Sequence, residues 1–206
     1  MKVNCIIDTC SCIYLSNAEF RQKSLLKYLF DTATLNYSKE VSLEIRDHAD
    51  KGLPPFIQKE SLKVSTLKYS INEYERRMLG KVLVSRHKGG NKGEIDNFLL
   101  SVDQLHHIKK NSTIFITDDE KALNGNLLGW LDSFPAIKVW TSYEVILFLY
   151  AEKIIPSKDI AVDLVRQIIY FTAPKLADRS QDTTNKLTRL LALYNKRIDN
   201  IATLLN

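Results

Sequence analysis

The chain opens with the run Val3-Asn4-Cys5-Ile6-Ile7-Asp8, in which a short apolar stretch ends in one carboxylate. Such a stretch predicts a buried β-strand. A second run of this kind, Thr113-Ile114-Phe115-Ile116-Thr117, is followed directly by Asp118 and Asp119. A carboxylate at the C-terminal end of a buried strand points into the crevice where open α/β sheets bind ligands. The two runs therefore predict both a class of fold and the edge of the sheet at which a site would lie.

Helical and strand-like stretches alternate between and beyond these two runs. The alternation predicts an α/β fold with a mainly parallel central sheet that is flanked by helices. We expect further strands at 35–37, 62–67 and 137–140, and helices at 13–30, 41–48 (capped by Ser38), 72–85 and 94–108, with a short helix or turn at 121–130.

After Tyr150 the strand signals stop, and the remaining sequence predicts helices only. We therefore divide the chain into a domain at 1–150 and a helical extension at 151–206, which packs on the core or mediates association. A polar break at 181–185, with Thr183 or Thr184 as the cap, precedes the last helix. That helix carries a coiled-coil-like seam of apolar residues: Leu187, Leu191, Tyr194, Ile198, Ile201 and Leu205.

The composition is that of a globular protein, with 45% hydrophobic and 26% charged residues among 206. The net charge of +5 suits a polyanionic partner without establishing one. The longest apolar stretch, 145–151, is far below the about 20 residues that a membrane span needs. No secretory signal is recognised at the N-terminus, so a cytoplasmic location is expected. The three cysteines, Cys5, Cys10 and Cys12, fit a reducing compartment and lack a fourth ligand for zinc.

Three more acids complete the pattern, since Glu94 and Asp96 open a predicted helix and Glu44 lies in another. Carboxylates that crowd together repel each other unless a cation or shared protons neutralise them. Mg²⁺ and Mn²⁺ prefer oxygen ligands, so either ion is the expected neutraliser. These observations favour a metal-dependent nuclease.

Four segments resemble, in order, the motifs of the PIN-domain nucleases. Ile6-Ile7-Asp8-Thr9-Cys10-Ser11 resembles the first motif, and Gly93-Glu94-Ile95-Asp96 resembles the central acidic motif at the start of a helix. Ile116-Thr117-Asp118-Asp119, with Asn124 shortly after, resembles the late motif, and Glu44 lies where the family carries its second acid. The resemblance covers residues 1–141 and leaves out the helical tail.

The resemblance implies a phosphodiesterase that cleaves RNA as an endoribonuclease and uses Mg²⁺ or Mn²⁺. It implies Asp8, Glu44, Glu94, Asp96 and Asp118 as catalytic residues. It implies Asp8, Asp96, Asp118 and Asp119 as metal ligands. Glu94 and Asp96 compete for one role, because helix positions two apart point in different directions. The implied partners are an RNA substrate and a protein antitoxin or regulator. Separately, the apolar seam of the last helix would allow association with a second copy of the chain. The implied setting is a toxin–antitoxin pair or phage defence.

Substrate binding is expected from two groups of residues. The hydroxyls of Thr9, Ser11 and Thr117 are placed to donate to a carboxylate or to a phosphate. The Gly-rich basic loop 86–93 precedes the acidic helix, and it presents Arg86, Lys88 and Lys92 to a phosphate backbone without reading sequence. An ordinary exposed loop is the alternative.

Each acid also has a purely structural interpretation. Asp8, Asp118 and Asp119 are typical helix caps, and Glu94 and Asp96 favour a helix N-terminus electrostatically. The competing hypothesis for the whole chain is a catalytically silent PIN-like scaffold that binds RNA or a protein. A receiver-type or phosphatase domain fits poorly, because it requires an acidic pair directly after the first strand and a lysine after the last.

Overall fold

A computed structural model describes residues 2–48, 63–64, 92–106, 112–120, 123, 129, 134–173 and 180–205. Within these ranges, none of the helices combines the length and the apolar character that crossing a membrane requires. The predicted helix 72–85 and the basic loop residues Arg86 and Lys88 lie outside the described residues, as does most of the segment 121–130.

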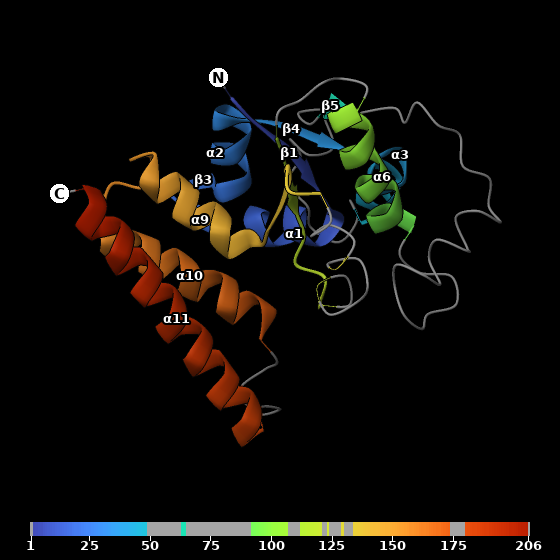
Figure 1. Ribbon diagram of the computed structural model, residues 1–206. Coiled ribbons are helices and arrows are strands. Elements are labelled where there is room, and N and C mark those ends of the chain that lie inside the picture. Colours follow the sequence, from blue (N-terminus) through green and yellow to red (C-terminus); the bar gives the residue numbers. More distant parts are fainter. Residues whose placement is uncertain are drawn as a thin grey trace. The chain divides into compact units, whose positions relative to one another are not determined.

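A five-stranded parallel sheet forms the centre of the structure, in the order β5-β4-β1-β6-β7. Every neighbouring pair in it is parallel, which confirms the predicted α/β class. β1 and β4 lie side by side in Figure 1. The strands are β1 (Val3–Ile7), β4 (Ala33–Tyr37), β5 (Lys63–Val64), β6 (Thr113–Ile116) and β7 (Ile137–Trp140).

The strand order reverses direction at β1. The chain first builds outward through β4 to β5, and then returns to add β6 and β7 on the other side of β1. In open α/β sheets, such a switch point is where the strand ends diverge and ligands bind. Asp8 follows β1 and Asp118 follows β6, so both lie at this switch point.

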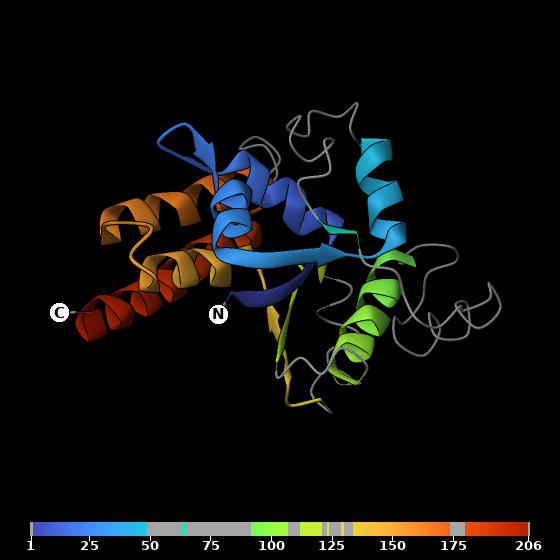
Figure 2. The same cartoon turned by 90° about the horizontal axis from the view of Figure 1, so that it is seen from above.

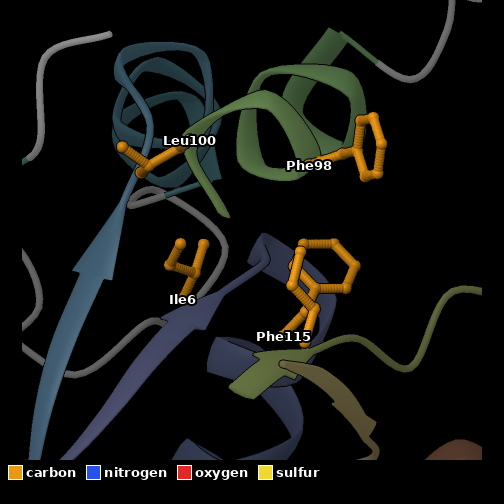
Figure 3. Packing of buried hydrophobic residues seen from close by; sticks show 5 residues of the cluster. Ile6, Phe98, Leu100 and Phe115 are labelled. Carbon is orange, nitrogen blue, oxygen red and sulfur yellow. The ribbon is translucent and has the colours of Figure 1, made fainter. Parts of the chain in front are cut away.

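Helix α6 (Lys92–His106) packs on one face of the sheet, against β1 and β6. Phe98 and Leu100 of α6 pack with Ile6 of β1 and Phe115 of β6, as Figure 3 shows, and Ile137 of β7 completes the cluster. Burial of a side chain of this size stabilises the fold by about 1.5–3 kcal/mol. This cluster fixes α6 over the strands whose ends carry the candidate acids.

Helix α3 (Lys39–His48) packs beside α6.

The prediction of one helix over 13–30 was wrong. Helix α1 (Thr9–Asn17) is followed by a hairpin of β2 (Glu19–Phe20) and β3 (Lys23–Ser24), and then by α2 (Leu25–Thr32). Arg21 and Gln22, at the hairpin turn, adopt φ angles of 50° and 59°. Glycine and asparagine usually fill such positions, so the sequence carries no turn signal there.

Tertiary contacts hold this unusual turn in place. The backbone N–H of Glu19 donates to the side-chain oxygen of Gln167 at 2.9 Å, and the Gln167 amide donates back to the Glu19 carbonyl at 3.3 Å. The Tyr28 hydroxyl donates to the Phe20 carbonyl at 3.2 Å. The partners are Gln167 on α10 and Tyr28 on α2, which lie outside the hairpin. Local propensity therefore does not predict this turn.

The C-terminal region is helical, as predicted: α9 (Ser142–Ala151), α10 (Lys158–Thr172) and α11 (Gln181–Leu205). α10 and α11 run side by side (Figures 1 and 2). Helix α11 starts earlier than predicted, because Ser180 accepts the N–H of Thr183 at 3.1 Å and acts as the cap. In the predicted seam, Tyr194 and Ile198 are buried within the chain's own fold.

The chain forms two compact units that differ from the predicted division at residue 150. One unit comprises Met1–Ile13 and Phe30–Thr141, and the other comprises Tyr14–Leu29 and Ser142–Asn206. Helix α9 belongs to the second unit because it packs on α10 and α11. The hairpin belongs there because β2 contacts α10.

Candidate functional site

Asp8 is the buried carboxylate at the end of β1, with 3% of its surface exposed. Its backbone N–H donates to the Ile116 carbonyl at 3.1 Å, which extends the β1–β6 ladder by one residue. Its Oδ1 accepts the N–H of Ser11 at 2.7 Å, so Asp8 also caps α1. The structural interpretation of Asp8 is therefore correct. A cap bond uses one lone pair of a carboxylate, which leaves others for a cation.

Thr117 fixes the other oxygen of Asp8. The Thr117 hydroxyl donates to Asp8 Oδ2, and both residues are buried. The backbone N–H of Thr117 donates to the Trp140 carbonyl at 2.9 Å, so β7 holds Thr117 in position. The orientation of the Asp8 carboxylate is thus set from two neighbouring elements, α1 and the end of β6.

Asp118 joins Asp8 through Ser11. The Ser11 hydroxyl donates to Asp118 Oδ2 at 2.7 Å, while its N–H bonds to Asp8. One residue in the first turn of α1 therefore contacts both carboxylates. Asp118 is partly exposed, in contrast to Asp8. The predicted juxtaposition of Asp8 and Asp118 is present in the structure.

Burial, together with the nearby charge of Asp118, raises the pKa of Asp8 to about 7, even though the hydrogen bonds from Thr117 and Ser11 lower it. A carboxyl group with this pKa is about half protonated at neutral pH. The folded state then binds more protons than the unfolded state between pH 4 and 7, so ionising Asp8 costs stability. A divalent cation would take the place of that proton.

Glu44 on α3 contacts the residue that follows Asp8. The Thr9 hydroxyl donates to Glu44 Oε2 at 2.6 Å. The same carboxylate lies against the first turn of α6, because a Cβ on Gly93 would stand 2.9 Å from Glu44 Oε1. Glycine therefore permits this close approach of α6 to the carboxylate. The three predicted hydroxyls of Thr9, Ser11 and Thr117 all donate to carboxylates here.

The remaining candidate acids are Asp96 and Glu94 on α6 and Asp119 after β6. Asp96 on α6 is buried, with 3% of its surface exposed. The side chains of Glu94 and Lys92 lie outside the description, although both positions are in α6. The backbone N–H of Asp119 donates to Thr117 Oγ1 at 3.3 Å. The N–H of Leu123 donates to the Asp119 carbonyl at 2.9 Å, as at the start of a helical turn.

Asn97 is a site-supporting residue that sequence reasoning missed. It lies on α6 and is fully buried. Its side-chain oxygen accepts the N–H of Ser38, and its amide donates to the Ile7 carbonyl, both at 2.9 Å. The only sequence signal was a polar residue next to Phe98 in the apolar pattern of the helix.

Within the described ranges, no three Asp, Glu, His or Cys side chains lie close enough together to share one ion. The donor set that the structure does assemble is the pair Asp8 and Asp118. Mg²⁺ is commonly held by one or two carboxylates, with water and substrate phosphate completing its six oxygens. Two carboxylates on rigid strand ends fit that mode of binding.

Comparison of the chain with known proteins gave no match to any protein-family model, to any curated protein or to any solved structure.

Proposed function

We propose that this chain is a metal-dependent nuclease of the PIN-like class that cleaves RNA internally. The observation that carries the proposal is the pair Asp8 and Asp118 at the switch point of a parallel sheet, joined through Ser11. This edge is where α/β sheets bind their ligands. A cation there would relieve the charge that burial makes costly at Asp8.

The candidate residues would have three roles: binding the metal, orienting its ligands and orienting the attacking water. Asp8 and Asp118 would hold Mg²⁺ or Mn²⁺, with Asp96 and Asp119 as further proposed ligands. Such an ion supplies a more acidic bound water and neutralises charge on the phosphoryl oxygens. Ser11 and Thr117 hold the two carboxylates in orientation. Glu44, held by Thr9, would orient the attacking water, with Glu94 at the start of α6.

The substrate would be held mainly through its backbone. A basic chain favours a polyanion, and we assign Arg86, Lys88 and Lys92 to contacts with RNA phosphates. Such contacts give affinity without sequence specificity. A cytoplasmic role as a toxin or defence effector, restrained by a protein antitoxin or regulator, agrees with this activity, and α11 is our proposed surface for association of two copies.

A silent scaffold that binds RNA or a protein is the second candidate. It is favoured by one observation, the capping role of Asp8, which gives this carboxylate a structural function of its own. The two candidates predict different effects when the negative charge of Asp8 is removed. A scaffold keeps its function when Asp8 becomes asparagine, because asparagine also caps helices well.

The deciding experiment is cleavage of a labelled mixed RNA pool by the purified protein, with Mn²⁺, Mg²⁺ or chelator. Asp8→Asn and Asp118→Asn are compared with Asp159→Asn, which changes an exposed carboxylate in the first turn of α10. We expect metal-dependent cleavage that is lost in the first two variants and kept in the third. RNA binding without cleavage, unchanged in all variants, would establish the scaffold instead.

A further inference from the structure

The β1–β4 ladder ends in an unusual way. Its last paired residues are Ile6 and Asn36. Just beyond, the carboxamide of Asn97 lies between the Ile7 carbonyl and the Ser38 N–H and bonds to both at 2.9 Å. A side chain from α6 thus takes the place that a further backbone rung would occupy. Both backbone groups are satisfied while the two strand ends are held apart.

Each end of this bridge leads directly to a candidate acid. Ile7 immediately precedes Asp8. Ser38 caps α3, since its side chain accepts the Val41 N–H at 3.3 Å and its carbonyl accepts the Ser42 N–H at 3.0 Å. Helix α3 carries Glu44, whose carboxylate accepts a hydrogen bond from the Thr9 hydroxyl. The bridge therefore ties the backbone of Asp8 to the helix of Glu44.

We propose that Asn97 is a positioning residue that sets the spacing between Asp8 and Glu44 at the candidate site, an inference that rests on the proposed nuclease function. Outer partners that orient metal ligands typically contribute 10–100-fold to metal affinity or activity. Asn97 acts through the two backbone groups that it holds, the Ile7 carbonyl and the Ser38 N–H, and not through a bond to either carboxylate.

The same helix offers a matched control. Gln104 is also buried on α6, and its side-chain oxygen accepts a hydrogen bond from Asn4 at 2.5 Å. Asn4 lies near the start of β1, at the opposite end of that strand from Asp8. Asn97→Leu and Gln104→Met each remove one buried amide from α6 and keep apolar bulk. Only the first change loosens the bridge at the strand ends.

Two readouts separate positioning from simple stability. The first is amide hydrogen exchange in metal-free protein at Ser38 and at Ser11, whose N–H reports on the position of Asp8. The second is Mn²⁺ affinity, measured by electron paramagnetic resonance. In Asn97→Leu we expect exchange at both amides to rise at least about 10-fold and Mn²⁺ affinity to fall about 10–100-fold. Gln104→Met should leave the affinity unchanged.

A further variant keeps the test decisive if Asn97→Leu does not fold. Asn97→Asp retains the acceptor for Ser38 and replaces the donor to Ile7 by an oxygen. We expect Ser38 to stay protected while exchange at Ser11 rises. Unchanged exchange at Ser11 in this variant, or equal losses of Mn²⁺ affinity in the Asn97 and Gln104 variants, would overturn the inference.

Failure of the proposed function has a different signature. Wild-type protein that neither binds Mn²⁺ nor cleaves RNA would refute the nuclease, and the positioning role of Asn97 at that site would fall with it. The exchange data would then show separately whether the bridge holds the two elements together.

Discussion

The acids of the candidate site and the acids of the C-terminal helices are held by different kinds of donor. At the site, hydroxyl groups donate to Asp8, Asp118 and Glu44. In the helical unit, cations pair with the acids: Lys158 with Asp199, Lys186 with Asp182, and Arg197 with Glu144, which also accepts a hydrogen bond from the Tyr194 hydroxyl. A hydroxyl orients a carboxylate but leaves its charge in place, whereas a cation cancels it. The hydroxyl and backbone donors of Asp8 therefore leave its negative charge available to an external cation.

The largest effect is expected from removing charge at the site. Asp8→Asn should lower RNA cleavage about 10²–10³-fold, comparable with the loss of one catalytic electrostatic group. Mn²⁺ should raise the melting temperature of the wild-type protein and leave that of the variant unchanged. Differential scanning fluorimetry with and without Mn²⁺ measures this. Equal stabilisation of both proteins would mean that Asp8 holds no metal.

The negative charge of buried Asp8 should also make the free energy of unfolding depend on pH. Because the pKa of Asp8 is raised from 3.8 to about 7, its contribution is fully present below pH 4 and is lost as pH rises to about 7. For a full interval of three pH units the loss is roughly 4 kcal/mol as an upper bound. Urea unfolding in chelator should show this fall in wild-type protein and a smaller one in Asp8→Asn. Parallel pH profiles would contradict the raised pKa.

A smaller effect is expected from removing one hydroxyl donor. Thr117→Val removes the hydroxyl that donates to Asp8. It should lower cleavage about 10–100-fold, as loss of an orienting partner does. Thr113→Val is its control, because Thr113 is equally buried at the start of the same strand and accepts a bond from Asn4. The control should lose stability and keep the cleavage rate per folded molecule. Equal rates in the two variants would show that Thr117 does not orient Asp8.

The smallest effect is expected in the helical unit. Arg197→Met breaks the 2.6 Å pair with Glu144, and Arg197 is 45% exposed at its side chain. Exposed pairs of this kind contribute less than about 1 kcal/mol. The free energy of unfolding should change within that limit, and cleavage should not change. A loss of cleavage would show that this pair supports the site and would end the contrast between the two groups of acids.

Sequence periodicity predicted the strands of the central sheet because runs such as Ile114-Phe115-Ile116 are continuous, apolar, and rich in β-branched and aromatic residues. It failed at the hairpin because Arg21 and Gln22 fill turn positions that glycine or asparagine usually marks. At the site, strand ends alone predicted that Asp8 and Asp118 would meet. Asn97 escaped prediction, because its partners at Ile7 and Ser38 are 90 and 59 residues away.

The division into two units affects how the chain folds during translation, because one unit combines an early segment with a late one. Residues 14–29 belong with residues 142–206, and Glu19 is bonded to Gln167 across 148 positions. These early residues include Leu15, Leu25 and Leu26, which are fully buried in the finished fold, and their unit is complete only once residues 142–206 have been synthesised. A chaperone bound to this segment during translation would be removed only as α10 forms.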